Sequence, residues 1–331
     1  MTVAPPPGYC QLAVIVGLGD TGLKVSRIGL GLAALGRPGY ITIGHAEDLS
    51  GETQVEQMRA HAHGVLDAAY DRGMRYFDAA RSYGLAEEFL GSWLTARGLT
   101  RDEVTVGSKW GYTYTAGWRT DAEVNEVKDL SIDTLRRQEG ESRVLLGEVL
   151  ALYQIHSVTI ESGVLDDAAV LGELARLRDA GLRIGFTATG PAQSDTIERA
   201  VQSGRFDAVQ ATFNLLDRSA GPALAAAREA GLGVIVKEAV ANGRLTDRGD
   251  VPELVDAARE RGVGTDALAL SFVLAQPWVD VALSGASTAP MLVSNLVALD
   301  VAFDDELAQR LSGLAEPPDS YWERRAALPW N

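Results

Sequence analysis

The 331-residue sequence contains a single cysteine, Cys10, and this scarcity excludes several kinds of site. One thiol cannot form an internal disulfide, and it cannot build a metal site that needs several cysteines. His61 and His63 stand two residues apart on an expected helix, so their side chains point to different faces. We therefore expect neither a disulfide framework nor a metal site.

Long apolar runs and an excess of positive charge are also lacking. No run reaches the roughly 18 apolar residues of a membrane-spanning helix, and the first ten residues lack the charged-then-apolar order of a signal peptide. The 45 Asp and Glu residues outnumber the 30 Lys and Arg residues, whereas nucleic acids and anionic membranes attract clustered positive charge. We expect a cytoplasmic protein that binds neither nucleic acid nor membrane.

What the sequence does have is a repeated unit in which a helical pattern, a glycine and a short apolar run follow one another. Clear copies begin at Tyr70, Leu177 and Ala227. In each, the glycine suits a left-handed helix end, and the apolar run suits a strand buried on both faces. Strands are expected at residues 28–33, 76–79, 104–108, 150–155, 183–187, 208–211, 233–236 and 279–283.

Eight such alternations without a break in composition favour one (β/α)₈ TIM barrel spanning residues 1–331. A doubly wound sheet could alternate in the same way. The three prolines within residues 1–10 predict a flexible, extended leader, and residues 315–331 form a C-terminal tail beyond the barrel.

Four polar residues stand at or just beyond expected strand ends: Asp78, Tyr83, Lys109 and His156. A TIM barrel places its reactive groups at this end of its strands. A carboxylate within the apolar run at Asp78 needs a cation, and Lys109 is the obvious partner. A cation close to Tyr83 would lower the pKa of its phenol, making it a credible proton donor. Each residue alone also has an ordinary structural interpretation, such as capping or packing.

The segment FDAARSYGLAEEFLG, residues 77–91, resembles the aldo-keto reductase signature, and VGSKWG and LYQIHS resemble the lysine and histidine segments of that family. The resemblance extends over residues 17–295. It implies a (β/α)₈ barrel that binds an extended nicotinamide cofactor. It further implies that Tyr83 is the general acid, Lys109 lowers the pKa of Tyr83, Asp78 holds Lys109, and His156 positions the substrate carbonyl.

The same resemblance gives VIVGLGDTG, residues 14–22, a structural interpretation. The segment satisfies the G-x-G-x-x-G pattern, but a dinucleotide-binding loop must open a helix, and the residues after Gly22 alternate as a strand does. The segment instead resembles the family's N-terminal β-hairpin, which caps the barrel bottom. We expect this hairpin at residues 11–27.

The resemblance also implies a set of cofactor-binding residues. A glutamine would hold the nicotinamide carboxamide and an aromatic residue would stack on the ring, with further contacts from the loops that follow. The residues at these positions are Thr187, Gln210, Phe213, Lys237, Asn242, Arg244, Ser284, Gly285 and Asn295. The family favours NADP(H), yet Gly285, Ala286 and Met291 offer no cation for a 2′-phosphate, which leaves NAD(H) open.

The substrate is expected to contact an aromatic loop at residues 111–130, with Trp110, Tyr112 and Trp118 as candidates. A surface excursion with packed aromatics is the alternative. In the tail, Trp322 and Trp330 could close over the pocket or pack on the barrel wall.

The leading hypothesis is an NAD(P)-dependent reductase or dehydrogenase acting on aldehydes, ketones or sugar-like substrates. The alternatives are a cofactor-binding barrel that serves as a regulatory or interaction subunit, and a degenerate reductase that binds no cofactor. From the family, a monomer or small homo-oligomer is expected.

Overall fold

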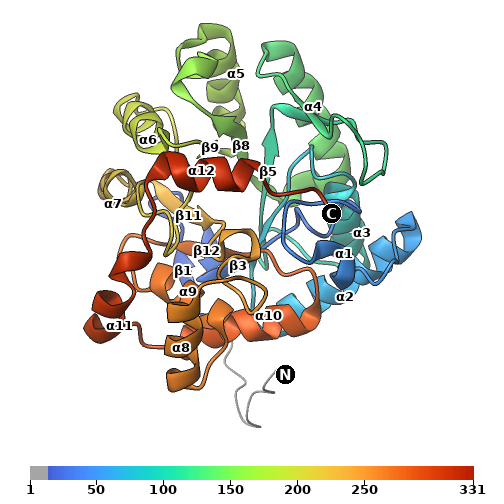
Figure 1. Cartoon of the computed structure of the whole chain (residues 1–331). Helices are drawn as coiled ribbons and strands as arrows, with labels where there is room; N and C mark the ends of the chain where they lie inside the picture. Colours follow the sequence, from blue (N-terminus) through green and yellow to red (C-terminus); the bar gives the residue numbers. More distant parts are fainter. Residues whose placement is uncertain (1–13) are drawn as a thin grey trace.

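Eight parallel strands close into a barrel in the computed structural model, which describes residues 14–331 (Figure 1). The strands neighbour one another in chain order, and the last pairs with the first. They are β3 (Ile28–Gly31), β4 (Tyr76–Asp78), β5 (Thr105–Trp110), β8 (Leu150–Val158), β9 (Arg183–Ala188), β10 (Ala208–Thr212), β11 (Gly233–Lys237) and β12 (Val281–Ser284). The predicted (β/α)₈ barrel is confirmed, and each expected strand lies where the apolar run predicted it. The expected leader at residues 1–10 lies outside the described residues.

Helices surround the barrel and cover the outer faces of its strands (Figure 1). The longer ones are α2 (Val55–Asp71), α3 (Ala86–Arg97), α4 (Ile132–Leu146), α5 (Ala168–Asp179), α6 (Gln193–Gln202), α7 (Gly221–Glu229), α8 (Pro252–Arg261), α9 (Thr265–Leu274), α10 (Ala289–Leu296) and α12 (Pro318–Ala326). Shorter ones are α1 (His45–Asp48), α11 (Asp305–Arg310), η1 (Gly147–Val149), η2 (Ile160–Ser162), η3 (Val164–Asp166), η4 (Ala241–Gly243), η5 (Val297–Asp300) and η6 (Ser312–Leu314).

Glycine ends three of these helices as the repeated unit predicts. Gly73, Gly181 and Gly231 have φ angles of 87°, 99° and 88°, which is left-handed backbone that residues with a Cβ atom rarely adopt. Each of them leads from a helix into the next barrel strand. None of the helices in residues 14–331 combines the length and apolar character needed to cross a membrane.

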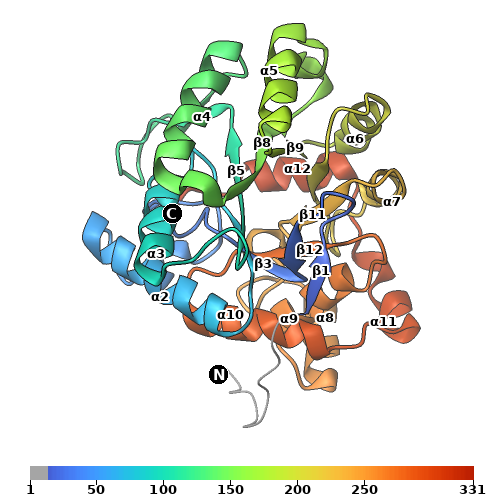
Figure 2. The same ribbon diagram turned by 180° about the vertical axis from the view of Figure 1, so that it is seen from behind.

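The β1–β2 hairpin closes one end of the barrel (Figure 2). β1 (Ile15–Gly17) and β2 (Lys24–Ser26) pair antiparallel, and Leu18 and Val25 are buried with inward-facing strand residues. Gly19 has a φ of 50°, and a Cβ atom there would lie within 2.6 Å of the backbone before β11. The predicted hairpin is therefore present, its described part beginning at residue 14, and its glycines form a tight turn beneath the barrel.

The opposite end, where the strands finish, is covered by the C-terminal segment and by an added hairpin. Helix α12 crosses this end in front of the strands in Figure 1, whereas Figure 2 shows the β1–β2 hairpin on the other side. The aromatic loop at residues 111–130 contains an antiparallel pair, β6 (Tyr112–Tyr114) and β7 (Glu126–Lys128). These segments form the surroundings of the candidate site.

Candidate active site

A buried ion pair links the ends of two neighbouring strands. Asp78 ends β4 and Lys109 lies in β5, and their side chains are 2% and 1% exposed. The Lys109 ammonium donates a hydrogen bond to Oδ2 of Asp78 and another to the carbonyl oxygen of Ala79, 2.9 Å away. Either charge alone would be costly at this depth, so the predicted pairing of the two residues satisfies both.

The other carboxylate oxygen of Asp78 accepts hydrogen bonds from three sides of the barrel interior. Tyr76 donates its hydroxyl at 3.2 Å, and the side-chain amides of Gln210 and Gln154 donate at 3.1 and 3.4 Å. Asp78 therefore joins β4, β5, β8 and β10 in one network, which fixes the direction of the Lys109 side chain.

Tyr83 lies on the turn that follows β4, directly above this pair. Gly84 makes the turn possible, because its φ is 60° and a Cβ atom there would lie 2.3 Å from the carbonyl oxygen of Gly36. The Lys109 ammonium lies 4.9 Å from the centroid of the Tyr83 ring. The His156 ring meets the Tyr83 ring edge-on, with 5.6 Å between centroids. All four residues of the predicted tetrad are thus gathered at one place.

The pKa of Tyr83 differs in direction from the sequence-based expectation. Burial and the Asp78 carboxylate raise the pKa of the phenol well above its ordinary value of 10, although Arg37 acts in the opposite direction. Burial and the Asp78 carboxylate outweigh the cations near the phenol, and Lys109 is itself paired with Asp78, so the net direction is opposite to the one expected. The phenol consequently stays protonated through neutral pH.

His156, in β8, stays uncharged at neutral pH. Burial lowers the pKa of the imidazole well below 6.5, and the positive charges of Lys109, Lys237 and Arg37 lower it further. Its Nδ1 atom is buried and has no hydrogen-bond partner among residues 14–331. A neutral imidazole carries one N–H group, which can donate a hydrogen bond to a substrate oxygen.

A cavity of about 1340 Å³ extends from Tyr83 and His156 to helix α10. Small-molecule pockets usually have volumes of roughly 300–1,000 Å³, so this cavity has room for a dinucleotide together with a substrate. Ten of the residues predicted to form the site line it: Asp78, Tyr83, Tyr112, His156, Gln210, Lys237, Asn242, Ser284, Gly285 and Asn295.

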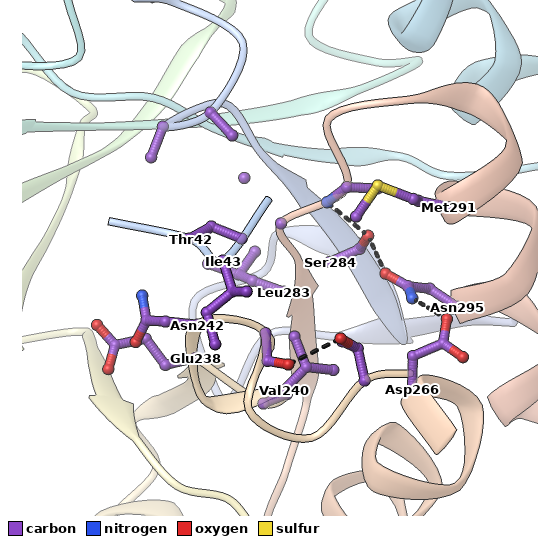
Figure 3. A pocket seen from close by; sticks show the side chains of 18 of the residues that line it. Thr42, Ile43, Glu238, Val240, Asn242, Asp266, Leu283, Ser284, Met291 and Asn295 are labelled. Atoms are coloured by element: carbon purple, nitrogen blue, oxygen red, sulfur yellow. Dashed lines mark hydrogen bonds between the residues drawn. The ribbon is translucent and has the colours of Figure 1, made fainter. Parts of the chain in front are cut away.

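The end of the cavity at α10 is polar and rigidly bonded (Figure 3). Ser284 donates to Oδ1 of Asn295 at 2.7 Å, and Asn295 donates from Nδ2 to Asp266 at 2.7 Å. Nothing lies within 4 Å of a Cβ atom built on Gly285, so the cavity is open there. The hydrogen-bonding groups and the open space suit a nucleotide, while Asp266, which the sequence analysis did not identify, adds a negative charge.

Three of the predicted cofactor contacts do not line the cavity. The expected stacking role of Phe213 is contradicted, because its ring packs outside the barrel against Phe272 and Trp278 at 5.4 and 4.9 Å between centroids. Arg244 forms an ion pair with Glu316 at 2.5 Å instead of facing the cavity. Thr187 is buried and accepts a hydrogen bond from the backbone N–H of residue 157 at 2.7 Å.

Side-chain alternation explains the placement of Phe213. Gln210 and Thr212 of β10 point into the barrel, since the first bonds Asp78 and the second bonds Lys237. Successive residues of a strand point to opposite faces, so Phe213 points outward.

Two of the three aromatic residues proposed for the substrate are structural. Trp110 is fully buried in the outer core, because its neighbour Lys109 points inward. Trp118 donates from its indole to the carbonyl oxygen of Thr53 at 2.6 Å and does not line the cavity. The expected substrate roles of Trp110 and Trp118 are therefore contradicted, whereas Tyr112 lies beside His156 with 5.0 Å between ring centroids.

Sequence reasoning missed Arg37, in the loop after β3. Its side chain is 2% exposed, pairs with Glu126 at 2.5 Å, and lies over the rings of Tyr83 and Trp330. Trp330 lines the cavity, whereas Trp322 packs on the barrel and donates to Asp217 at 3.1 Å. Of the two tail tryptophans, Trp330 thus lies at the cavity and Trp322 packs on the barrel. No local pattern in the sequence marks Arg37, because its partners come from distant segments.

The site and the barrel together match a known family. The model of the Aldo/keto reductase family matches residues 27–316, which is most of the chain. The chain belongs to the aldo/keto reductase family, and it is an oxidoreductase of that type.

Individual relatives are distant but extend over nearly the whole length. The chain is 26% identical to the uncharacterized oxidoreductase YrpG of Bacillus subtilis, with 92% of this chain and 98% of that protein covered. It is 27% identical to L-galactose dehydrogenase of Arabidopsis thaliana, with 91% and 93% covered. Among solved structures, the holo form of aldo-keto reductase AKR11C1 from Bacillus halodurans has a similar fold, with a TM-score of 0.72 at 23% identity over 92% of this chain and 97% of that one.

Proposed function

We propose that the protein interconverts aldehydes or ketones and the corresponding alcohols with a nicotinamide dinucleotide, and that Tyr83 is the general acid. The observation that carries this proposal is the convergence of Tyr83, His156 and the buried Asp78–Lys109 pair at one end of a cavity large enough for cofactor and substrate. The relationship to L-galactose dehydrogenase supports a sugar-like substrate as one option.

Each residue then has a defined task in carbonyl reduction. Tyr83 is protonated at neutral pH and donates its proton to the carbonyl oxygen as negative charge develops there. Neutral His156 donates a hydrogen bond to the same oxygen and orients it. The Lys109 ammonium beneath the Tyr83 ring stabilises the phenolate once the proton has left, and Asp78 holds that ammonium in place.

The nicotinamide cofactor, when bound, supplies or accepts the hydride. Gln210 lines the catalytic end and offers an amide for its carboxamide group. Ser284, Gly285 and Asn295 would hold the nucleotide at the far end, and Asn242 lies on the cavity wall formed by the loop after β11 (Figure 3).

We further propose that the protein binds NAD(H) at least as well as NADP(H), although the family favours NADP(H). Residues 283–295 contain no lysine or arginine, and Asp266 adds a carboxylate at this end. Of the arginines on the cavity wall, Arg248 is paired with Asp48 and Arg259 with Asp256. Arg72 also lines the wall and forms no ion pair within residues 14–331. A 2′-phosphate would therefore meet the Asp266 carboxylate at this end, with Arg72 as the unpaired arginine on the cavity wall.

Replacement of the Tyr83 phenol tests the proposed reaction. Tyr83→Phe removes the proton donor while keeping the ring, so kcat for aldehyde reduction should fall roughly 10²–10⁴-fold, while cofactor affinity, measured by fluorescence titration, stays unchanged. Tyr114→Phe is the matched control, because Tyr114 lies on β6 and does not line the cavity. Wild-type turnover in the Tyr83→Phe variant would refute the assignment. Cofactor binding by the wild type without turnover of any carbonyl would favour a regulatory barrel.

A further inference from the structure

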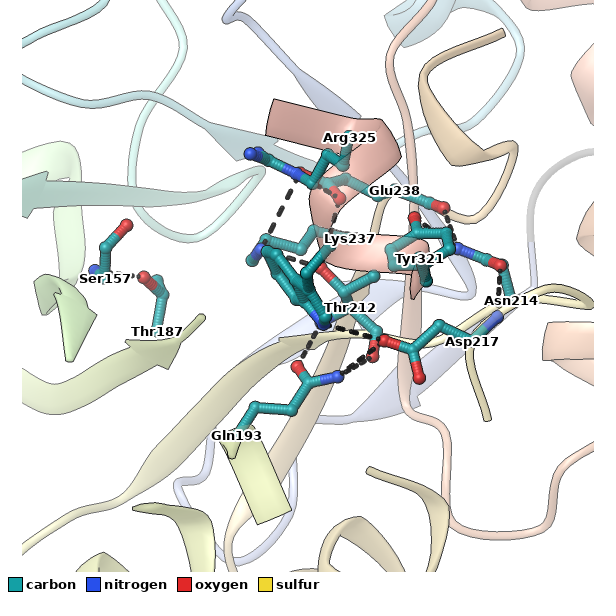
Figure 4. A network of polar contacts seen from close by, with 11 residues as sticks. Ser157, Thr187, Gln193, Thr212, Asn214, Asp217, Lys237, Glu238, Tyr321 and Arg325 are labelled. Carbon is teal, nitrogen blue, oxygen red and sulfur yellow. Dashed lines mark hydrogen bonds and ion pairs between the residues drawn. The ribbon is translucent and has the colours of Figure 1, made fainter. Parts of the chain in front are cut away.

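Lys237 presents hydrogen-bond donors that no described residue uses (Figure 4). It ends β11 and points into the barrel, because Ile235, two residues earlier, belongs to the inner core. Its ammonium donates to Oγ1 of Thr212 at 2.8 Å, and the nearest carboxylate oxygen, Oε1 of Glu238, lies beyond hydrogen-bond distance at 3.8 Å. An ammonium has three N–H donors, so two remain free among the contacts within residues 14–331.

Arg325, from helix α12, has a free donor group in the same place. Its Nε atom lies 2.9 Å from both carboxylate oxygens of Glu238, and its Nη2 atom lies 2.5 Å from Oε1. Its Nη1 atom makes no hydrogen bond within the described part of the chain. Arg325 and Lys237 both line the cavity that contains Tyr83 and His156.

Lys237, Arg325, Glu238 and Thr212 form one cluster, and the side-chain acceptors in it are already engaged. Both carboxylate oxygens of Glu238 accept from Arg325, and Oε2 also accepts from the Thr212 hydroxyl at 3.2 Å. The Thr212 oxygen in turn accepts from Lys237. The cluster therefore offers donors to a ligand and no spare side-chain acceptor.

The charges of the cluster do not cancel. Burial lowers the pKa of Lys237 to about 8, which still leaves it mostly protonated at neutral pH. Burial alone would raise the pKa of Glu238, but the charges of Arg325 and Lys237 lower it to about 2. The three residues Lys237, Arg325 and Glu238 together carry about one positive unit, and the charge of the Asp217 carboxylate also acts on Lys237.

We propose that Lys237 and Arg325 bind a carboxylate group carried by the carbonyl substrate, so that the protein acts on aldehyde or keto acids. This inference rests on the proposed function, since it assigns the substrate of the same site. A carboxylate brings acceptors only, and its single negative charge balances the cluster. A sugar hydroxyl would also bring a donor that needs an acceptor, and a phosphate dianion would exceed the available positive charge.

The proposal is tested by comparing semialdehyde acids with their methyl esters. A series that differs in the number of methylene groups, including succinic semialdehyde, covers the span from carbonyl to carboxylate. For the semialdehyde acid that the wild type turns over most efficiently, kcat/KM should be roughly ten- to a hundredfold higher than for its methyl ester. The difference should come mainly from a lower KM for the acid, as expected for charge-assisted hydrogen bonds.

Variants of Lys237 assign that preference to the cluster. Lys237→Met should bring the acid-to-ester ratio close to one, and Lys237→Arg should keep most of the preference. Lys24→Met is the matched control, because Lys24 is exposed on β2 at the opposite end of the barrel. It should leave the ratio unchanged.

Distinct results overturn the inference and the proposed function. Equal wild-type turnover of acids and esters, or an acid preference that persists in Lys237→Met, overturns the carboxylate site and leaves the reductase standing. A Lys237→Met variant that loses cofactor affinity but keeps the acid-to-ester ratio assigns Lys237 to the cofactor instead, as the family resemblance implies. Absence of both cofactor binding and carbonyl turnover in the wild type refutes the proposed function, and the inference with it.

Discussion

The ion pair between Glu238 and Arg325 should make the stability of the protein depend on pH in a defined way. Glu238 is 8% exposed, and its pKa falls from 4.5 to about 2 because of Arg325 and Lys237. One pKa unit corresponds to about 1.4 kcal/mol, so ionised Glu238 contributes about 3 kcal/mol to folding at neutral pH. The pKa is depressed in the folded state, so this stabilisation is present above pH 4.5 and is lost as the pH falls towards 2.

Glu238→Gln removes this contribution while nearly preserving the volume of the side chain. The variant should be less stable than the wild type by about 3 kcal/mol near pH 7, with a further cost from the unpaired Arg325 guanidinium. The difference between the two proteins should narrow by about 2 kcal/mol as the pH approaches 3, because the wild type then loses the stabilisation that the variant never had.

Urea unfolding followed by circular dichroism measures this difference, from neutral pH down to the lowest pH at which the native fold persists. Glu323→Gln is the control. Glu323 is exposed on helix α12, which also carries Arg325, and it forms no ion pair within residues 14–331. A stability difference between Glu238→Gln and the wild type that is constant across the pH range would refute the reasoning. It would mean that the effect is one of packing and not of charge.

The barrel strands could be predicted from the sequence because their signals are local. A glycine such as Gly181 ends one helix, and the apolar run after it is long enough for one buried strand. The same local pattern repeats eight times along the chain, which favours a barrel but does not by itself exclude a doubly wound sheet. Asp78 and Lys109 were predictable for a related reason, since a charge inside an apolar run requires a partner.

The residues that were misplaced show where local reasoning stops. Phe213 and Trp110 follow inward-pointing residues and must therefore face outward, so strict alternation along the strand could have excluded both from the cavity. The direction of the Tyr83 pKa depends on how deeply the phenol is buried and on whether Lys109 is already paired, and sequence spacing reports neither.

The position of Arg325 beside Lys237 and Glu238 could not be predicted, although Lys237 itself was a predicted site residue. Glu238 and Arg325 are separated by 87 positions, and Arg325 reaches the cavity only because helix α12 packs across the strand ends. Near Arg325 the tail contains several charged residues, of which Arg324 pairs with Glu316 instead. Nothing in the local sequence distinguishes the one arginine from the other.

Two further predictions concern charged residues of the cavity. Asp78→Asn leaves the Lys109 ammonium without a counterion, so the free energy of unfolding measured in urea should fall by roughly 3–5 kcal/mol. Adding Lys109→Met should recover part of this loss. A loss below about 1 kcal/mol would contradict the pairing. Titration of the wild type should show NADH binding at least as tightly as NADPH. Asp266→Asn should then shift the preference towards NADPH, because it removes a negative charge from the nucleotide end while its amide can still accept a hydrogen bond from Asn295. NADPH binding more than roughly tenfold tighter than NADH, about 1.4 kcal/mol, would refute the proposed preference and point to a cation at the 2′-phosphate, such as the unpaired Arg72.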